Sequence, residues 1–172
     1  MMKLRGLNDY DICNYKKPCM FLIFPYCNFK CDHEANTNVC QNSTLAHEPI
    51  IEVEPTELIM RYLENPLTHA VVCGGLEPLD SQEDLLQFIT LFRGFSNDDI
   101  IIYTGYKESE VQDFIKMLQK FNNIIVKFGR FIPDSPHIYD PILGVELASD
   151  NQYALEIHNE YISNYGGEGE NE

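Results

Sequence analysis

The sequence predicts an α/β fold built on a parallel sheet, either open or partly closed like a fragment of a barrel. Two observations predict it: short apolar runs recur along the chain, and helical patterns lie between them. The runs are continuous rather than alternating, which is typical of parallel strands covered on both faces. The chain has 172 residues and no obvious linker, so we expect one domain.

Four apolar runs are expected to form the strands. Each is too short for a helix, and each is followed by a residue that ends strands or turns the chain. The runs cover residues 20–24, 70–73, 100–103 and 124–128, and they are followed by Pro25, Gly74, Thr104-Gly105 and Gly129.

Helical patterns at residues 56–63, 85–92 and 114–121 separate the four runs. Ser81 and Ser109 each open a sequence that resembles a capping box, just before the second and third patterns. The order is therefore βαβαβαβ, and crossovers of this type give a parallel sheet. Residues 130–165 break this rhythm with three prolines, and residues 152–157 are compatible with one further strand.

Charge and hydropathy exclude several classes of protein. The net charge is −15, from 27 acidic and 12 basic residues, so the chain repels phosphate backbones and we expect no nucleic-acid partner. No apolar run approaches the roughly 20 residues of a membrane span. The polar N-terminal sequence predicts no secretory signal and a cytoplasmic location. We expect a single domain over residues 1–165 and a flexible, acidic tail over residues 166–172.

Five of the six cysteines lie in the first quarter of the chain, which in a reducing compartment indicates metal or redox chemistry. Cys27, Cys31 and Cys40 are separated by three and by eight residues. An iron–sulfur cluster held by three thiolates, with one iron left open, is the first interpretation. A zinc site with His33 as the fourth ligand is the second, although the eight-residue gap fits zinc poorly. Cysteines without any ligand are the third.

Other unusual residues follow the strands at their carboxyl ends, where parallel α/β sheets bind ligands. Gly74 and Gly75 remove side chains where a ligand approaches the backbone. Glu77 is a candidate to accept a hydrogen bond from a ligand ammonium group, or else an acid that complements a helix N-terminus. Thr104 offers a hydroxyl, or else simple turn chemistry. We expect these residues and the cysteines to converge on one rim.

The run from Cys27 to Cys31, the third cysteine and the Gly-Gly-Leu-Glu-Pro sequence at 74–78 resemble the radical S-adenosylmethionine enzymes. More narrowly, they resemble the small activating proteins of the anaerobic ribonucleoside-triphosphate reductase. Residues 104–106, 129–132 and 149–152 extend this resemblance over nearly the whole chain, from about residue 14 to residue 157.

The sequence departs from the family pattern in two places. The family has two residues between its second and third cysteines, which here leads to Glu34, whereas the next cysteine is Cys40. We favour Cys40, because a carboxylate is a poor match for cluster iron. Leu76 separates Gly75 from Glu77 where the family has no residue, and we expect a small bulge that leaves Glu77 turned toward the ligand.

The resemblance implies a partial (β/α) barrel of parallel strands, of radical S-adenosylmethionine type, in a single domain. It implies a 4Fe–4S cluster on Cys27, Cys31 and Cys40, and S-adenosyl-L-methionine bound near Gly74, Gly75, Glu77 and Thr104. Cleavage of this cofactor gives a 5′-deoxyadenosyl radical, which takes a hydrogen atom from a glycine of a large reductase partner. An electron donor such as a flavodoxin is also implied.

Two other functional classes stay open at this stage. One is a small radical enzyme that acts on a free metabolite, as a deazapurine synthase does. The other is an adaptor that binds zinc or a cluster without catalysis.

Overall fold

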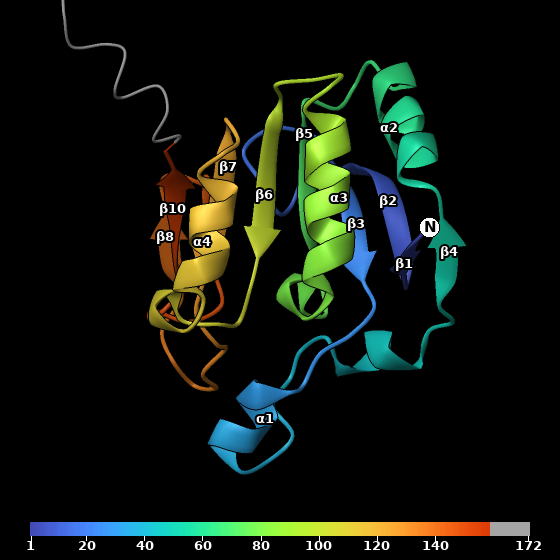
Figure 1. Ribbon diagram of the computed structural model, residues 1–172. Helices are drawn as coiled ribbons and strands as arrows, with labels where there is room; N and C mark the ends of the chain where they lie inside the picture. Colours follow the sequence, from blue (N-terminus) through green and yellow to red (C-terminus); the bar gives the residue numbers. More distant parts are fainter. Residues whose placement is uncertain (159–172) are drawn as a thin grey trace, which may run out of the picture.

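The computed structural model describes residues 1–158, which form a six-stranded sheet with three helices on one face (Figure 1). Residues 159–172 lie outside the described part, and with them the expected tail at 166–172 and the end of the expected domain. The elements, in chain order, are β1 Met2–Leu4, β2 Gly6–Asp11, β3 Cys19–Phe24, α1 Lys30–Ala35, β4 Ile51–Val53, α2 Pro55–Glu64, β5 Ala70–Gly75, α3 Gln82–Phe92, β6 Asp99–Tyr103, α4 Gln112–Leu118, β7 Ile124–Phe128, β8 Ile138–Asp140, β9 Val145–Leu147 and β10 Tyr153–Ile157.

The strand order in the sheet is β10-β7-β6-β5-β3-β2. The neighbours β3, β5, β6 and β7 are parallel, which confirms the four predicted strands and their direction. The edge strands β2 and β10 are antiparallel to their neighbours, and β10 confirms the strand suggested at residues 152–157. Because β2 and β10 are both edges, the sheet is not closed into a barrel.

The three predicted helices are confirmed as α2, α3 and α4. Their apolar sides pack on one face of the sheet, where Phe88, Phe92 and Phe128 are among the largest fully buried side chains. This burial, rather than helix propensity, is what stabilises helices as short as α4.

Both predicted capping boxes are wrong. A 3₁₀ turn at Pro78–Ser81 leads directly into α3, and the Ser81 side chain makes no capping hydrogen bond. The carboxylate of Asp84 accepts the backbone N–H of Lys3 instead, at 3.1 Å. The helix α4 begins only at Gln112, the last residue of the second predicted box, and Glu110 accepts the Lys107 N–H at 2.8 Å.

The opposite face of the sheet is covered by the chain's own loops. The second apolar cluster lies there, and residues from the loop before β3 and from the β8–β9 region pack on inward-facing strand residues. Its buried members are Tyr15, Cys19, Ala70, Val72, Ile101, Ile125, Leu143, Leu147 and Ala154.

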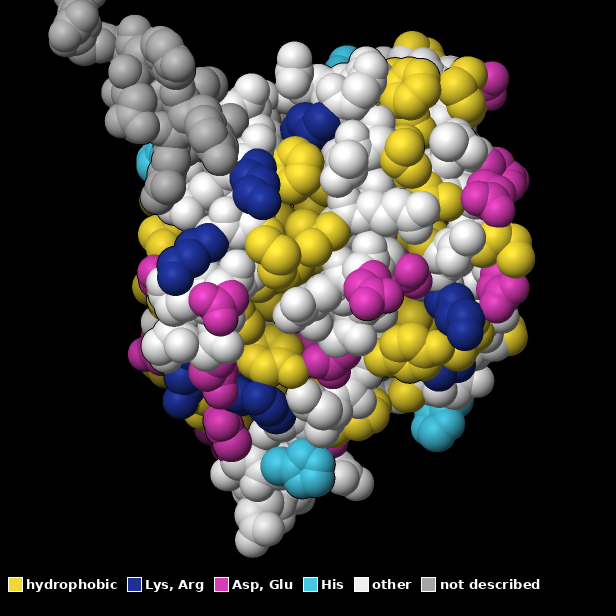
Figure 2. Space-filling model, in the orientation of Figure 1, with side chains coloured by type: hydrophobic (Ala, Val, Ile, Leu, Met, Phe, Trp, Pro, Cys, Tyr) yellow, Lys and Arg dark blue, Asp and Glu magenta, His cyan; other side chains and the backbone are white. Residues whose placement is uncertain are grey.

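The outer face of the helices has a mixed surface. Acidic, basic and hydrophobic side chains are interspersed there, and acidic ones are not gathered in one patch (Figure 2). Among residues 1–158 no helix is long and apolar enough to cross a membrane.

Candidate metal centre

One cavity of about 460 Å³ collects most of the residues that the sequence singled out. Cys27, Cys31 and Cys40 all line it. They come from the loop that follows β3 and carries α1, and this loop extends beyond the carboxyl ends of β3 and β6 (Figure 1). The predicted residues Gly75, Glu77 and Thr104 also line the cavity, whereas Gly74 does not. The expected convergence on one rim is therefore observed for all but one residue.

The first two cysteines are positioned by a tight turn after β3. Phe29 adopts a left-handed conformation, with φ of 52°, and starts the short helix α1. This turn lets the backbone N–H of Phe29 donate to Sγ of Cys27 at 3.2 Å. Cys31 lies in the first turn of α1, close to Gly105, where an added Cβ would stand 3.8 Å from the Cys31 sulfur.

Glu77 is a buried carboxylate at the edge of the sheet, with 5% of its surface exposed. One carboxylate oxygen accepts the Gly105 N–H at 2.8 Å, and the other accepts the Leu79 N–H at 3.0 Å. The Thr104 hydroxyl also donates to this carboxylate. Burial outweighs these three hydrogen bonds and raises the pKa of Glu77 to about 7. The bond to Leu79 caps the following 3₁₀ turn, so the structural role foreseen for Glu77 is present.

Both glycines of the predicted element belong to β5 and pair with β3. Gly75 has φ of +87°, and an added Cβ would stand 2.5 Å from Cγ2 of Ile23. An added Cβ on Gly74 would stand 3.1 Å from the Phe21 ring. Close packing of β5 on β3 therefore explains both glycines before any ligand is considered.

Two buried polar side chains, Thr104 and Lys127, line the cavity. Thr104 is 2% exposed, and its Oγ1 accepts the Tyr106 N–H at 3.0 Å. Lys127 lines the cavity and donates to the carbonyl of Gly129 at 3.2 Å. Burial lowers the pKa of Lys127 to about 8, although the nearby Glu77 acts in the opposite direction. Among residues 1–158, Lys127 and Glu77 do not form an ion pair within 4 Å.

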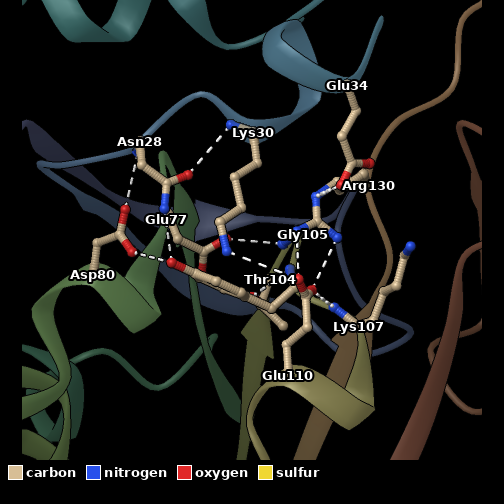
Figure 3. A network of polar contacts seen from close by, with 11 residues as sticks. Asn28, Lys30, Glu34, Glu77, Asp80, Thr104, Gly105, Lys107, Glu110 and Arg130 are labelled. Atoms are coloured by element: carbon tan, nitrogen blue, oxygen red, sulfur yellow. Dashed lines mark hydrogen bonds and ion pairs between the residues drawn. The ribbon is translucent and has the colours of Figure 1, made fainter.

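A polar network ties the start of the cysteine loop to the edge of the sheet (Figure 3). The Asn28 backbone N–H donates to Asp80 at 3.0 Å, and its side-chain amide donates to the Tyr106 hydroxyl at 2.8 Å. That hydroxyl in turn donates to Asp80 at 2.7 Å. The ammonium group of Lys30 lies 4.2 Å from the centre of the Tyr106 ring. The loop is therefore held at its first turn by hydrogen bonds to the segments that follow β5 and β6.

Arg130 holds α1 from the other side, and its side chain is only 4% exposed (Figure 3). Its guanidinium binds both carboxylate oxygens of Glu110, at 2.8 and 2.9 Å, and its Nε lies 3.2 Å from the Glu34 carboxylate. This arginine holds the pKa of Glu110 at about 2. Glu34 thus faces Arg130 and is not among the cavity residues; His33 is exposed and does not line the cavity either.

Sequence reasoning assigned no firm role to Lys127, which lines the cavity, or to Arg130, which binds Glu110 and faces Glu34 beside it. The turn at 129–132 was noted only as part of the resemblance. In the structure the segment 149–152 closes over it: Gln152 donates to the Gly129 carbonyl at 3.1 Å, and Asn151 to the Arg130 carbonyl at 2.8 Å. These side-chain bonds fix the turn that presents Arg130.

Comparison with protein families decides between the interpretations of the cysteines. The model of a family described as "4Fe-4S single cluster domain" matches residues 18–147, about three quarters of the chain. The chain belongs to this family. No curated protein and no solved structure matches it. The match includes Cys27, Cys31 and Cys40 but not Cys13, the fourth cysteine that lines the cavity. The iron–sulfur interpretation agrees with the family, whereas the zinc and ligand-free interpretations do not.

The donor set fits the cluster of a 4Fe–4S single cluster domain. Three half-buried thiols face one cavity, and three thiolates leave one iron of a four-iron cluster without a protein ligand. Burial raises the pKa of Cys27 to about 12 and also raises that of Cys40, so binding of a cluster by these thiols would release protons. Within residues 1–158 no three His, Cys, Asp or Glu side chains are already grouped closely enough to hold a metal ion. The thiolates of a four-iron cluster each bind a different iron, so they need not be grouped as closely as the ligands of a single ion.

Proposed function

We propose that this 4Fe–4S protein is a radical S-adenosylmethionine enzyme of the activating type, which installs a glycyl radical on a partner similar to the anaerobic ribonucleotide reductase. One observation carries the proposal: three cysteines of one loop share a cavity with Gly75, Glu77 and Thr104 at the ends of parallel strands. The cluster, when bound, supplies the electron that cleaves S-adenosylmethionine into methionine and a 5′-deoxyadenosyl radical. The residues of the chain bind and orient the cofactor and exclude water.

Cys27, Cys31 and Cys40 are the proposed ligands of the cluster. The positions of the two side chains support Cys40 over Glu34 as the third ligand. The Cys40 side chain lines the cavity, and the Glu34 carboxylate is engaged by Arg130 on the outer side of α1. A thiolate is also the better donor for cluster iron.

Glu77 and Thr104 are the proposed polar contacts for the amino-acid end of the cofactor. The Glu77 carboxylate already accepts hydrogen bonds from Gly105, Leu79 and Thr104, and the last of its four lone pairs is available to a ligand ammonium group. Gly75 supplies a cavity wall without a side chain. Gly74 does not line the cavity, so in the proposal it serves only to let β5 pack closely on β3.

The architecture belongs to the same proposal. We interpret the open six-stranded sheet, with helices outside and the cavity inside, as a partial (β/α) barrel in a single domain. A cytoplasmic location, a flavodoxin-like electron donor and the absence of nucleic-acid and membrane partners are proposed with it.

Cofactor cleavage is the first test. After anaerobic reconstitution with iron and sulfide, the protein is mixed with S-adenosylmethionine and a strong reductant, and 5′-deoxyadenosine is measured by chromatography. We expect 5′-deoxyadenosine from the wild type and none from Cys40→Ala, with weaker cofactor binding in Glu77→Ala. A protein that holds an intact cluster and forms no 5′-deoxyadenosine would contradict the radical enzyme and favour the adaptor.

The nature of the substrate is the second test. With an anaerobic ribonucleotide reductase from the same organism added to the same mixture, we expect the electron paramagnetic resonance doublet of a glycyl radical on the large protein. Because the net charge is −15, we expect the two proteins to associate less at high salt. An affinity between the two proteins that does not change with salt concentration would contradict an interface based on charge.

A free metabolite is the second candidate substrate, and one observation favours it. The segment Val145–Leu147 forms part of the cavity wall, so the chain itself closes a side that a protein partner would otherwise have to cover. Formation of 5′-deoxyadenosine without any glycyl radical, together with conversion of a small molecule such as a nucleobase, would move the assignment to this class.

A further inference from the structure

Asp32 lies directly after the second cysteine, and its side chain folds the loop back on itself. Its Oδ1 accepts two backbone N–H groups, those of Val39 and Cys40, both at 2.7 Å. Its backbone carbonyl also accepts the Thr37 N–H at 3.2 Å. One residue thus binds the chain at three points beyond the end of α1.

These bonds bring the third cysteine to the second. Eight residues separate Cys31 from Cys40, and a free loop of that length allows many separations of its ends. Because Asp32 is the neighbour of Cys31 and holds the amide of Cys40, the distance between the two cysteines depends on one side chain. Both cysteines line the same cavity, as this requires.

Burial of α1 does not hold the loop in this way. The helix α1 has no buried residue, and Glu34 and Asn36 are exposed. Asn36 adopts a left-handed conformation, with φ of 55°, which turns the chain out of the helix but does not bring it back to the cavity. A carboxylate that accepts two backbone N–H groups makes stronger hydrogen bonds than a neutral acceptor, and it orders the loop before the cluster binds.

We propose that Asp32 is a positioning residue, which closes the long loop between the second and third cysteines and so presents Cys40 to the cluster. This inference rests on the proposed function of Cys40 as the third ligand. In this role Asp32 does not touch iron. Its hydrogen bonds keep Cys40 near Cys31, as a short spacing between the two cysteines in the sequence would.

Hydrogen exchange in the cluster-free protein tests the hydrogen bonds themselves. In Asp32→Ala we expect the Val39 and Cys40 amides to lose protection while amides of the sheet keep theirs. His33→Ala is the matched control, because this neighbouring side chain is exposed and does not line the cavity. Unchanged protection at both amides in Asp32→Ala would overturn the inference, whether or not the protein binds a cluster.

Iron retention tests the consequence for the cluster. After reconstitution we expect iron to be lost to a chelator about 10–100-fold faster from Asp32→Ala than from the wild type or His33→Ala, as for other outer contacts of metal ligands. Asp32→Asn keeps an acceptor oxygen and should lie between the wild type and Asp32→Ala. The absorption of the bound cluster at about 400 nm should fall together with the iron content in Asp32→Ala.

Two outcomes on iron would overturn the proposal. Iron retention in Asp32→Ala equal to the wild type would show that Cys40 needs no such positioning. Equal loss in Asp32→Asn and Asp32→Ala would show that the carboxylate itself binds the metal. A wild type that binds no cluster, but loses amide protection on Asp32→Ala, would refute the proposed function and leave the loop closure standing.

Discussion

The two sides of the cavity are built in different ways. On the side of the sheet, Glu77 and Thr104 are buried, and Gly75 packs against Ile23 in the neighbouring strand. On the side of the loop, the three cysteines are half-buried and α1 buries no residue. The sheet side is held by strand pairing and apolar packing, whereas the loop side is held by hydrogen bonds and ion pairs.

This difference suggests that the two sides respond differently to ligand binding and to substitution. The sheet side belongs to the core, so its residues are fixed before any ligand binds. The loop side buries no residue of α1, so it can adjust to a ligand at little cost in free energy. We therefore expect substitutions on the sheet side to lower the stability of the fold strongly, and substitutions on the loop side to affect the cluster more than the stability.

The largest effect on stability is expected for Gly75→Ala. The added Cβ would overlap Ile23, and φ of +87° is unfavourable for any residue with a side chain. We expect the free energy of unfolding to fall by about 3 kcal/mol in chemical denaturation. Gly6→Ala is the control, because there the nearest atom to a new Cβ is 3.6 Å away. A Gly75→Ala variant as stable as Gly6→Ala would remove the distinction between the two sides.

A pH effect is expected from Glu77. Its pKa is about 7 in the folded protein and near 4.5 when unfolded, so the folded state binds more protons between these values. The free energy of unfolding should therefore fall as pH rises from about 4.5 to about 7, by about 3 kcal/mol at most. The difference between wild type and Glu77→Gln, measured across this range, isolates the contribution of this carboxyl group. A difference that does not change with pH would contradict a buried, ionisable Glu77.

A smaller effect is expected from Arg130→Lys, which sharpens the comparison on the loop side. Lysine keeps the charge but cannot bind both oxygens of Glu110 while also facing Glu34. We expect faster hydrogen exchange in residues 30–35 and a fall of about 1 kcal/mol in the free energy of unfolding. Lys116→Ala is the control, since the Lys116–Asp113 pair is largely exposed and 3.6 Å long. Unchanged exchange in residues 30–35 would show that Arg130 does not restrain α1.

The sequence predicts those elements whose burial leaves a regular pattern of apolar residues along the chain. The strands β5, β6 and β7 are continuous apolar runs because both of their faces are buried, and the run at 20–24 gave β3 for the same reason. The edge strand β2 was missed because its residues are polar and half-exposed. The helix α1 was missed because it has six residues and no apolar face.

The site divides in the same way. The cysteines and the residues after the strands were predictable, because parallel topology brings strand ends together. The roles of Asp32 and Arg130 were not, because each depends on loop conformation: Asp32 reaches amides seven and eight residues away, and Arg130 meets Glu110 across two different turns. Gly74 was assigned to the ligand from its sequence position alone, yet in the structure it packs on Phe21.

The most direct test of the central claim is the cluster content of the six single cysteine-to-alanine variants after anaerobic reconstitution, measured as iron per chain and by absorption near 400 nm. We expect Cys27→Ala, Cys31→Ala and Cys40→Ala to lose the 4Fe–4S cluster and keep the stability of the cluster-free fold. Cys13→Ala, Cys19→Ala and Cys73→Ala should keep the cluster, although Cys19 and Cys73 are buried and their loss should lower stability. A full cluster in Cys40→Ala, with its loss in Glu34→Ala, would contradict the account.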